Sequence, residues 1–240
     1  MATFNRLITL NTAVSELMGS MGLLAPADVT ASTDKTVIQM RYLANKVGEE
    51  LLNENSWQVL DKDWTITTDG VTLTYDLPAD WDHFYQDASW NQTTRMPTVG
   101  SLTNQEWAQL KARNLGGTTF AMLYIIQNDQ LTFYSVGDTP QTIVLPYVSR
   151  GWVRSALGVL KDNLAANDDV ILYDPALFKA ALKRAWQMDK GFDSTAAQLA
   201  YKDALNAAIS KELPARTLTL ATPQYPYISI NNLPITGYGP

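Results

Sequence analysis

The chain has 240 residues, of which 46% are hydrophobic, so it is long enough to bury a substantial core. It contains no cysteine and one histidine, His83, which excludes disulfides, thiolate metal sites, cysteine nucleophiles and zinc sites built on several histidines. The formal charge of −6 argues against a protein that wraps nucleic acid with a basic face. Only 18% of the residues are charged, against roughly a quarter in an average soluble protein, and low charge is typical of surfaces that become interfaces.

The apolar runs of the sequence are short. The longest, such as residues 122–126, have the length of a strand and fall far below the ~20 residues of a membrane span. The first residues also lack a charged region followed by a long apolar stretch. We therefore expect no membrane contact, and a protein made and kept in a cytoplasm-like compartment.

Two helices are predicted near the N-terminus from apolar residues at three- and four-residue spacing. The first covers residues 5–21 and ends at Gly22. The second covers residues 33–53, and either Ser32 or Asp34 can cap it. Its predicted buried stripe is Val37, Met40, Ala44, Val47 and Leu51.

The pattern changes to β near Trp57. Alternation over residues 64–76 around Asp69-Gly70 predicts a β-hairpin with a type I′ turn, because that dipeptide favours positive φ angles. Three further strands are predicted at 118–127, 130–135 and 142–148, with Asn128-Asp129 as the first turn between them. A helix is predicted at 104–113, where Thr103 and Glu106 fit a capping box.

Helices return in the last third of the chain. Asp174-Pro175 predicts a helix start, since aspartate caps and proline suits the first helical position, and Gly191 ends this helix. Ser194 is predicted to cap a last, alanine-rich helix that runs to about Lys211. The simplest α+β architecture is a helical bundle made from the N- and C-terminal helices, with an antiparallel β-domain inserted in it.

The last residues, 214–240, have a composition of their own. They hold five of the eleven prolines and one charged residue, Arg216, so a helix or a central strand is excluded. The segment is too apolar for a solvated tail, and we interpret it as an extended arm that lies on a partner; the alternative is a tail packed on its own domain. The predicted contact residues of this arm are Leu218, Leu220, Pro223, Tyr225, Tyr227, Ile228, Ile230, Leu233, Ile235 and Tyr238.

The predicted organisation therefore has four parts. Residues 1–56 supply the N-terminal helices, 57–153 the inserted β-rich domain, 154–213 the C-terminal helices and 214–240 the extended arm.

Sequence motifs for catalysis and cofactors are sparse. The chain has no P-loop, dinucleotide fingerprint or nucleophile elbow, and we expect a protein that is not an enzyme and has no cofactor. Asp80 and Asp82 could form an acid/base patch, but aspartates are common in turns. Asn167-Asp168-Asp169 could bind Ca²⁺ but lacks the spacing of a calcium loop, which favours an ordinary loop. His83, between aromatic residues, is interpreted as a half-buried structural histidine.

Several segments together resemble one protein family. They are Val29–Asp34 with the following helix through Gly48-Glu-Glu-Leu51, Asn55–Leu60, Tyr75–Asp82, Trp90-Asn91, the stretch from Pro97 through Gly100 to Trp107, Tyr147–Val153, and Trp186 with Lys190-Gly191. Over residues 7–195 these resemble the head-to-tail adaptors of tailed bacteriophages, related to the tail tubular protein A group of short-tailed phages.

The resemblance implies a structural virion protein of the neck or tail, assembled in the host cytoplasm. Such adaptors form a ring, usually twelve-fold, under the portal protein and carry a tail or nozzle protein on the other side. Double-stranded DNA passes through the lumen without specific binding, which suits an acidic subunit.

On this interpretation the arm binds the portal. Four aromatic residues are predicted to contact the tail protein or a ring neighbour: Trp81, Phe84, Trp90 and Trp152, of which Trp90 and Trp152 are expected to be exposed. The alternative is a tail-associated protein that binds or cleaves carbohydrate with Asp80, Asp82 and exposed tryptophans. A nucleic-acid-binding factor is disfavoured by the charge.

Overall fold

The structure, a computed structural model, describes residues 7–85, 88–113 and 122–212 and has an α+β fold. It divides into two compact units. Unit 1 consists of the described residues within 1–64, 76–86 and 145–212, and unit 2 of those within 65–75 and 87–144. The predicted arm, residues 214–240, and all ten of its contact residues lie outside the described part of the chain.

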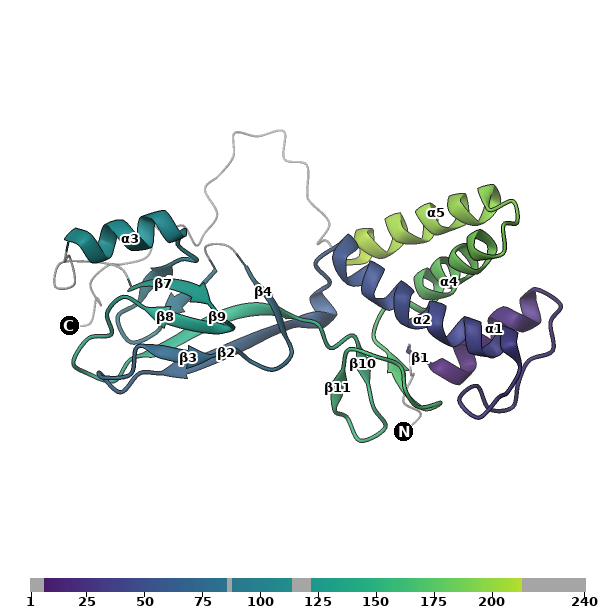
Figure 1. The fold of residues 1–240 in the computed structure, drawn as a ribbon, viewed down its shortest axis with the longest axis horizontal. Coiled ribbons are helices and arrows are strands. Elements are labelled where there is room, and N and C mark those ends of the chain that lie inside the picture. The colour runs from purple at the N-terminus through teal and green to yellow at the C-terminus, as the bar shows by residue number, and fades with distance from the viewer. Residues whose placement is uncertain (1–6, 86–87, 114–121, 213–240) are drawn as a thin grey trace, which may run out of the picture. The chain divides into compact units, whose positions relative to one another are not determined.

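Unit 1 holds helices from both ends of the chain (Figure 1). They are α1 (Leu10–Ser20), α2 (Lys35–Glu54), α4 (Pro175–Asp189) and α5 (Thr195–Glu212). Helix α4 contacts each of the other three. The predicted stripe of α2 is confirmed, because all five of its residues are buried in the core of this unit.

The predicted helix starts are confirmed at α2 and α4 by cap geometry. Asp34 accepts a hydrogen bond from the backbone N–H of Thr36 at 2.7 Å, and Asp174 accepts one from that of Ala176 at 2.8 Å. The predicted start of the first helix at residue 5 is wrong. Ile8–Thr9 instead forms a strand, β1, and Thr9 caps α1.

A small sheet in unit 1 was not expected from the sequence. Its order is β1, β12 (Val170–Ile171), β10 (Val153–Arg154) and β11 (Leu160–Lys161), and each neighbouring pair is antiparallel. Each strand has only two residues, which is too short for a periodic pattern to reveal. Unit 1 also contains the short 3-10 helix η1 (Gln58–Leu60) and β4 (Trp81–Phe84), which pairs with the end of β9 (Thr142–Ser149).

Unit 2 is built on neighbouring strands in the order β5 (Trp90–Asn91), β6 (Met96–Val99), β7 (Met122–Gln127), β8 (Gln130–Phe133) and β3 (Thr74–Asp76). The pairs β5–β6 and β7–β8 are antiparallel, as predicted for this domain. The pair β6–β7 is parallel, so the expectation of an antiparallel domain is wrong there. Helix α3 (Asn104–Arg113) lies between these two strands in the chain, and a helical connection is what allows a parallel return.

The two predicted turns of unit 2 have opposite outcomes. Asn128 and Asp129 have φ angles of 52° and 58°, and they join β7 to β8 as a type I′ turn. The hairpin predicted at Asp69-Gly70 does not form, since β2 (Asp61–Thr67) and β3 are not neighbours in the sheet. The Asp69 carboxylate instead accepts hydrogen bonds from the N–H groups of Val71 and Thr72, which closes a local Asx turn.

The predicted capping box of α3 is confirmed. The N–H of Thr103 donates to the Glu106 carboxylate at 2.8 Å, and the N–H of Glu106 donates to the Thr103 hydroxyl at 3.3 Å. Across the ranges that the structure describes, none of the helices is both long and apolar enough to cross a membrane.

Candidate functional site

The four aromatic residues predicted to form an interface have different surroundings. Trp81 and Phe84 lie on β4 in unit 1, and Trp90 lies on β5 in unit 2; all three are half-buried. Trp152 is fully buried, so the expectation that it is exposed is wrong. Its ring stacks on Tyr173 at a centroid distance of 5.8 Å and on Phe178 at 6.3 Å.

Trp81 and Phe84 belong to an aromatic cluster in unit 1. Phe84 stacks on Trp64 at 6.1 Å and lies 5.5 Å from Trp81 and 6.4 Å from Tyr147, between ring centroids. Tyr147 is buried, whereas the other three rings keep part of their surface in solvent. Partly exposed aromatic rings held by packing are typical of protein interfaces.

Asp80 lies beside this cluster and holds two segments of unit 1 together. Its carboxylate accepts hydrogen bonds from Lys62 Nζ at 2.5 Å, the Ser149 hydroxyl at 2.7 Å and the Tyr147 hydroxyl at 3.0 Å. Burial raises the pKa of Asp80, but the bonds from Lys62, Ser149 and Tyr147 outweigh it and hold the pKa below its usual value.

This environment bears on the acid/base alternative. A glycosidase needs one carboxyl group with a raised pKa to protonate the leaving oxygen, and the shift at Asp80 has the opposite sign. Asp82 is not part of the Asp80 network, and its carboxylate lies 2.7 Å from Nδ1 of His83. His83 is exposed, so the prediction of a half-buried histidine is wrong. The contacts of Asp80 are those of a structural group that joins the loop before β4 to β2 and β9.

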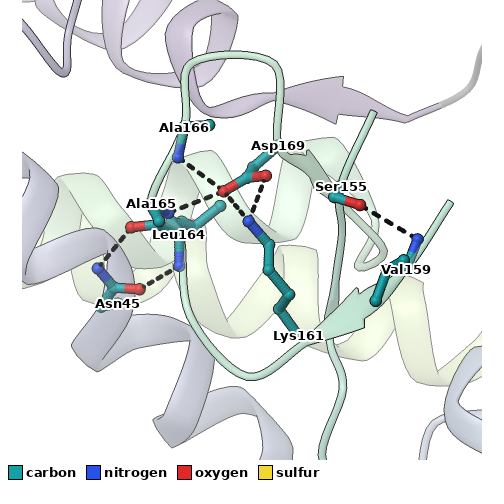
Figure 2. A network of polar contacts seen from close by, with 8 residues as sticks. All are labelled: Asn45, Ser155, Val159, Lys161, Leu164, Ala165, Ala166 and Asp169. Atoms are coloured by element: carbon teal, nitrogen blue, oxygen red, sulfur yellow. Dashed lines mark hydrogen bonds and ion pairs between the residues drawn. The ribbon is translucent and has the colours of Figure 1, made fainter. Parts of the chain in front are cut away.

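The Asn167-Asp168-Asp169 segment is an ordered loop (Figure 2). The Asp169 carboxylate, 1% exposed, pairs with Lys161 Nζ at 2.6 Å and accepts the N–H groups of Ala165 and Ala166 at 2.8 Å. These donors occupy the oxygens that a calcium ion would need. Among the described residues, no group of three or more histidine, cysteine or acidic side chains is placed to hold a metal ion.

Unit 1 also contains a groove that the sequence did not reveal. It has a volume of about 780 Å³ and lies between α2, α4 and α5. Arg184 crosses it, donating to the Glu50 carboxylate at 2.9 Å and lying over the Tyr201 ring at 4.0 Å. The apolar periodicity of α5 is weak and does not indicate a groove. The residues that line the groove come from α4 and α5 and from α2, which is far from both in the chain.

The sequence matches the model of a known protein family. The family model described as SU10 adaptor protein matches residues 8–226, which is most of the chain. The match supports the predicted phage adaptor, and it does not support the narrower relation to the tail tubular protein A group. No curated protein matches the sequence.

Proposed function

Because the chain belongs to the SU10 adaptor protein family, a family of phage head-to-tail adaptors, we propose that it forms a ring under the portal and joins the capsid vertex to the tail. The family match over residues 8–226 is the observation that carries this proposal. An adaptor of this kind is a structural virion protein of the neck, with the portal on one side and a tail protein on the other.

Each part of the chain has a proposed structural role. The helices of both ends form a bundle that joins ring neighbours, and the arm at 214–240 lies along the portal. An extended arm covers a large area per residue, at the cost of the entropy lost on ordering. The usual ring of twelve copies leaves a lumen through which double-stranded DNA passes, and the net charge of −6 suits a wall that does not hold DNA.

The partly exposed aromatic side chains of each unit are the proposed contacts for the tail protein or a ring neighbour. Trp81, Phe84 and Trp90 are supported in this role by their partial exposure. Trp152 does not take part in this contact, because its side chain has no solvent-exposed surface for a partner to bind.

Deletion of residues 216–240 tests the portal contact. The truncated and full-length proteins are compared in a pull-down on immobilised portal, with circular dichroism to show that both are folded. We expect the truncated protein to remain folded and to lose portal binding. Portal binding at full strength without these residues would show that the arm is not the attachment.

A further inference from the structure

The hairpin formed by β10 and β11 carries exposed aliphatic side chains at its tip. We define the hairpin tip as residues 155–159, in which Leu157 is 92% exposed and Val159 is 60% exposed. The N–H of Ser155 donates to the Val159 carbonyl at 2.8 Å, and the N–H of Val159 donates to the Ser155 hydroxyl at 3.1 Å. Gly158 takes a φ of +83°, which lets the chain turn tightly. The tip is therefore a closed turn that presents apolar side chains to solvent.

The base of this hairpin is fixed in unit 1 (Figure 2). Val153 is fully buried, and Lys161 is held by the buried Asp169 carboxylate. The loop that follows is tied to α2, because the Asn45 amide accepts the N–H of Leu164 at 2.6 Å and donates to its carbonyl at 3.3 Å. A projection held in this way loses little conformational entropy when it binds.

The groove between α2, α4 and α5 has a size and a lining that fit such a projection. Leu43, Ala185, Met188 and Leu205 supply apolar surface, and Met188 is 56% exposed. Charged side chains of both signs make up most of the rest of the lining, so the groove can take apolar side chains with a charge beside them. Helices α2 and α5 both contact α4, which lies between them in Figure 1. The groove volume of about 780 Å³ lies within the roughly 300–1,000 Å³ range of sites that enclose a ligand group.

Charge and placement both favour a second copy of this chain as the occupant. Arg154, at the base of the tip, and Glu54, on the groove lining, are exposed and of opposite charge. Neither forms a salt bridge with any residue that the structure describes. In Figure 1 the hairpin lies below α2 and α5 lies above it, so within unit 1 they lie on opposite sides of α2.

We propose that the hairpin tip of one copy docks in the α2–α4–α5 groove of the next, with Leu157 and Val159 against the apolar lining and Arg154 facing Glu54. This inference rests on the proposed ring and names its contact. A contact between two different surfaces can repeat head-to-tail from one copy to the next. Such a contact forms a closed ring when the rotation between neighbouring copies divides a full turn.

Cysteine crosslinking tests the contact directly, because the natural chain has no cysteine. Leu157→Cys and Met188→Cys change exposed side chains and leave the core intact. Under oxidation, a mixture of the two variants is expected to give a crosslinked dimer, and the double variant a ladder up to the size of the ring. Each single variant alone stays uncrosslinked, because the two surfaces differ.

Leu24→Cys is the matched control, since Leu24 is 91% exposed and lies in unit 1 outside both surfaces. The reactions are run on concentrated full-length protein and on protein assembled with portal. The proposal is overturned if Leu157→Cys crosslinks to Leu24→Cys as well as to Met188→Cys, if it crosslinks to itself, or if the pair fails to crosslink in both samples.

Charge reversal gives a second, independent measurement. Arg154→Glu and Glu54→Arg are each expected to weaken association between copies roughly tenfold, and the double variant is expected to recover it. Ring size and yield are measured by mass photometry in the presence of portal. Rings that form equally well with each single reversal would refute this contact and leave the proposed adaptor function standing. Absence of rings from the natural chain would refute the proposed function itself.

Discussion

Gly48→Ala is predicted to destabilise the chain, although the same change in most helices is stabilising. Gly48 lies within α2, where alanine is favoured over glycine by about 1 kcal/mol. A Cβ at this position would lie 2.1 Å from Cζ2 of Trp152, whereas carbon atoms pack at about 3.5–4.0 Å. The indole ring would have to move by more than ~1 Å to restore normal packing.

The surroundings of Trp152 leave it no room to move. Its side chain is fully buried and stacked on Tyr173 and Phe178. A shift of the Gly48 backbone would instead weaken the 3.1 Å hydrogen bond that its carbonyl accepts from the Tyr173 hydroxyl. Overpacking costs about 1–3 kcal/mol, and a lost hydrogen bond adds about 1 kcal/mol. After the helical gain is subtracted, we expect a loss of about 1–3 kcal/mol and a Tm lower by roughly 2–12 °C.

Gly19→Ala is the control, because Gly19 is also helical and nothing lies within 4 Å of an added Cβ. Urea unfolding followed by circular dichroism measures both variants. We expect Gly19→Ala to match or exceed the stability of the natural chain. Gly48→Ala is expected to cost less when it is added to Trp152→Phe than when it is added to the natural chain. Equal stability of Gly48→Ala and Gly19→Ala would show that Trp152 does not restrict this position.

Three further predictions concern the aspartate networks. Lys161→Met leaves the buried Asp169 carboxylate without its cation and is expected to cost about 2–3 kcal/mol in urea unfolding; a loss below ~0.5 kcal/mol would contradict this. Burial raises the pKa of Asp169, but Lys161 and two backbone amides outweigh burial and hold this pKa below 3.8, its value in the unfolded chain. The ionised carboxylate therefore stabilises the fold at pH values above 3.8. The stability gap between the natural chain and Asp169→Asn should therefore be full above about pH 5 and shrink as the pH falls below 3.8, and a gap that widens toward acid would have the wrong sign. Asp80→Asn is expected to cost about 1–2 kcal/mol, because a partly exposed carboxylate loses its charge-assisted bonds, and an unchanged thermal transition would refute its structural role.

Features fixed by local chemistry were predictable from the sequence. The caps at Asp34 and Asp174 and the capping box at Thr103 and Glu106 depend on neighbouring residues, and all of them are present. The turn at Asn128-Asp129 is also local, since both residues tolerate positive φ.

Features decided by distant partners were not predictable. Asp69-Gly70 has the composition of a hairpin turn, yet the backbone after it pairs elsewhere: the N–H of Phe133 donates to the Leu73 carbonyl at 2.8 Å. Trp152 looked like an interface residue by type, but a glycine on α2, 104 positions earlier, opens the space that buries it. The groove and the two-residue strands of unit 1 likewise depend on segments that meet only in the folded chain.

The adaptor function is tested most directly by imaging purified full-length protein mixed with the portal of the same phage. Mass photometry gives the mass added per portal, and negative-stain electron microscopy shows where it binds. We expect a ring of this chain at one end of the portal, with an added mass that is a whole multiple of 26.6 kDa. Portals that remain bare at micromolar protein would contradict it.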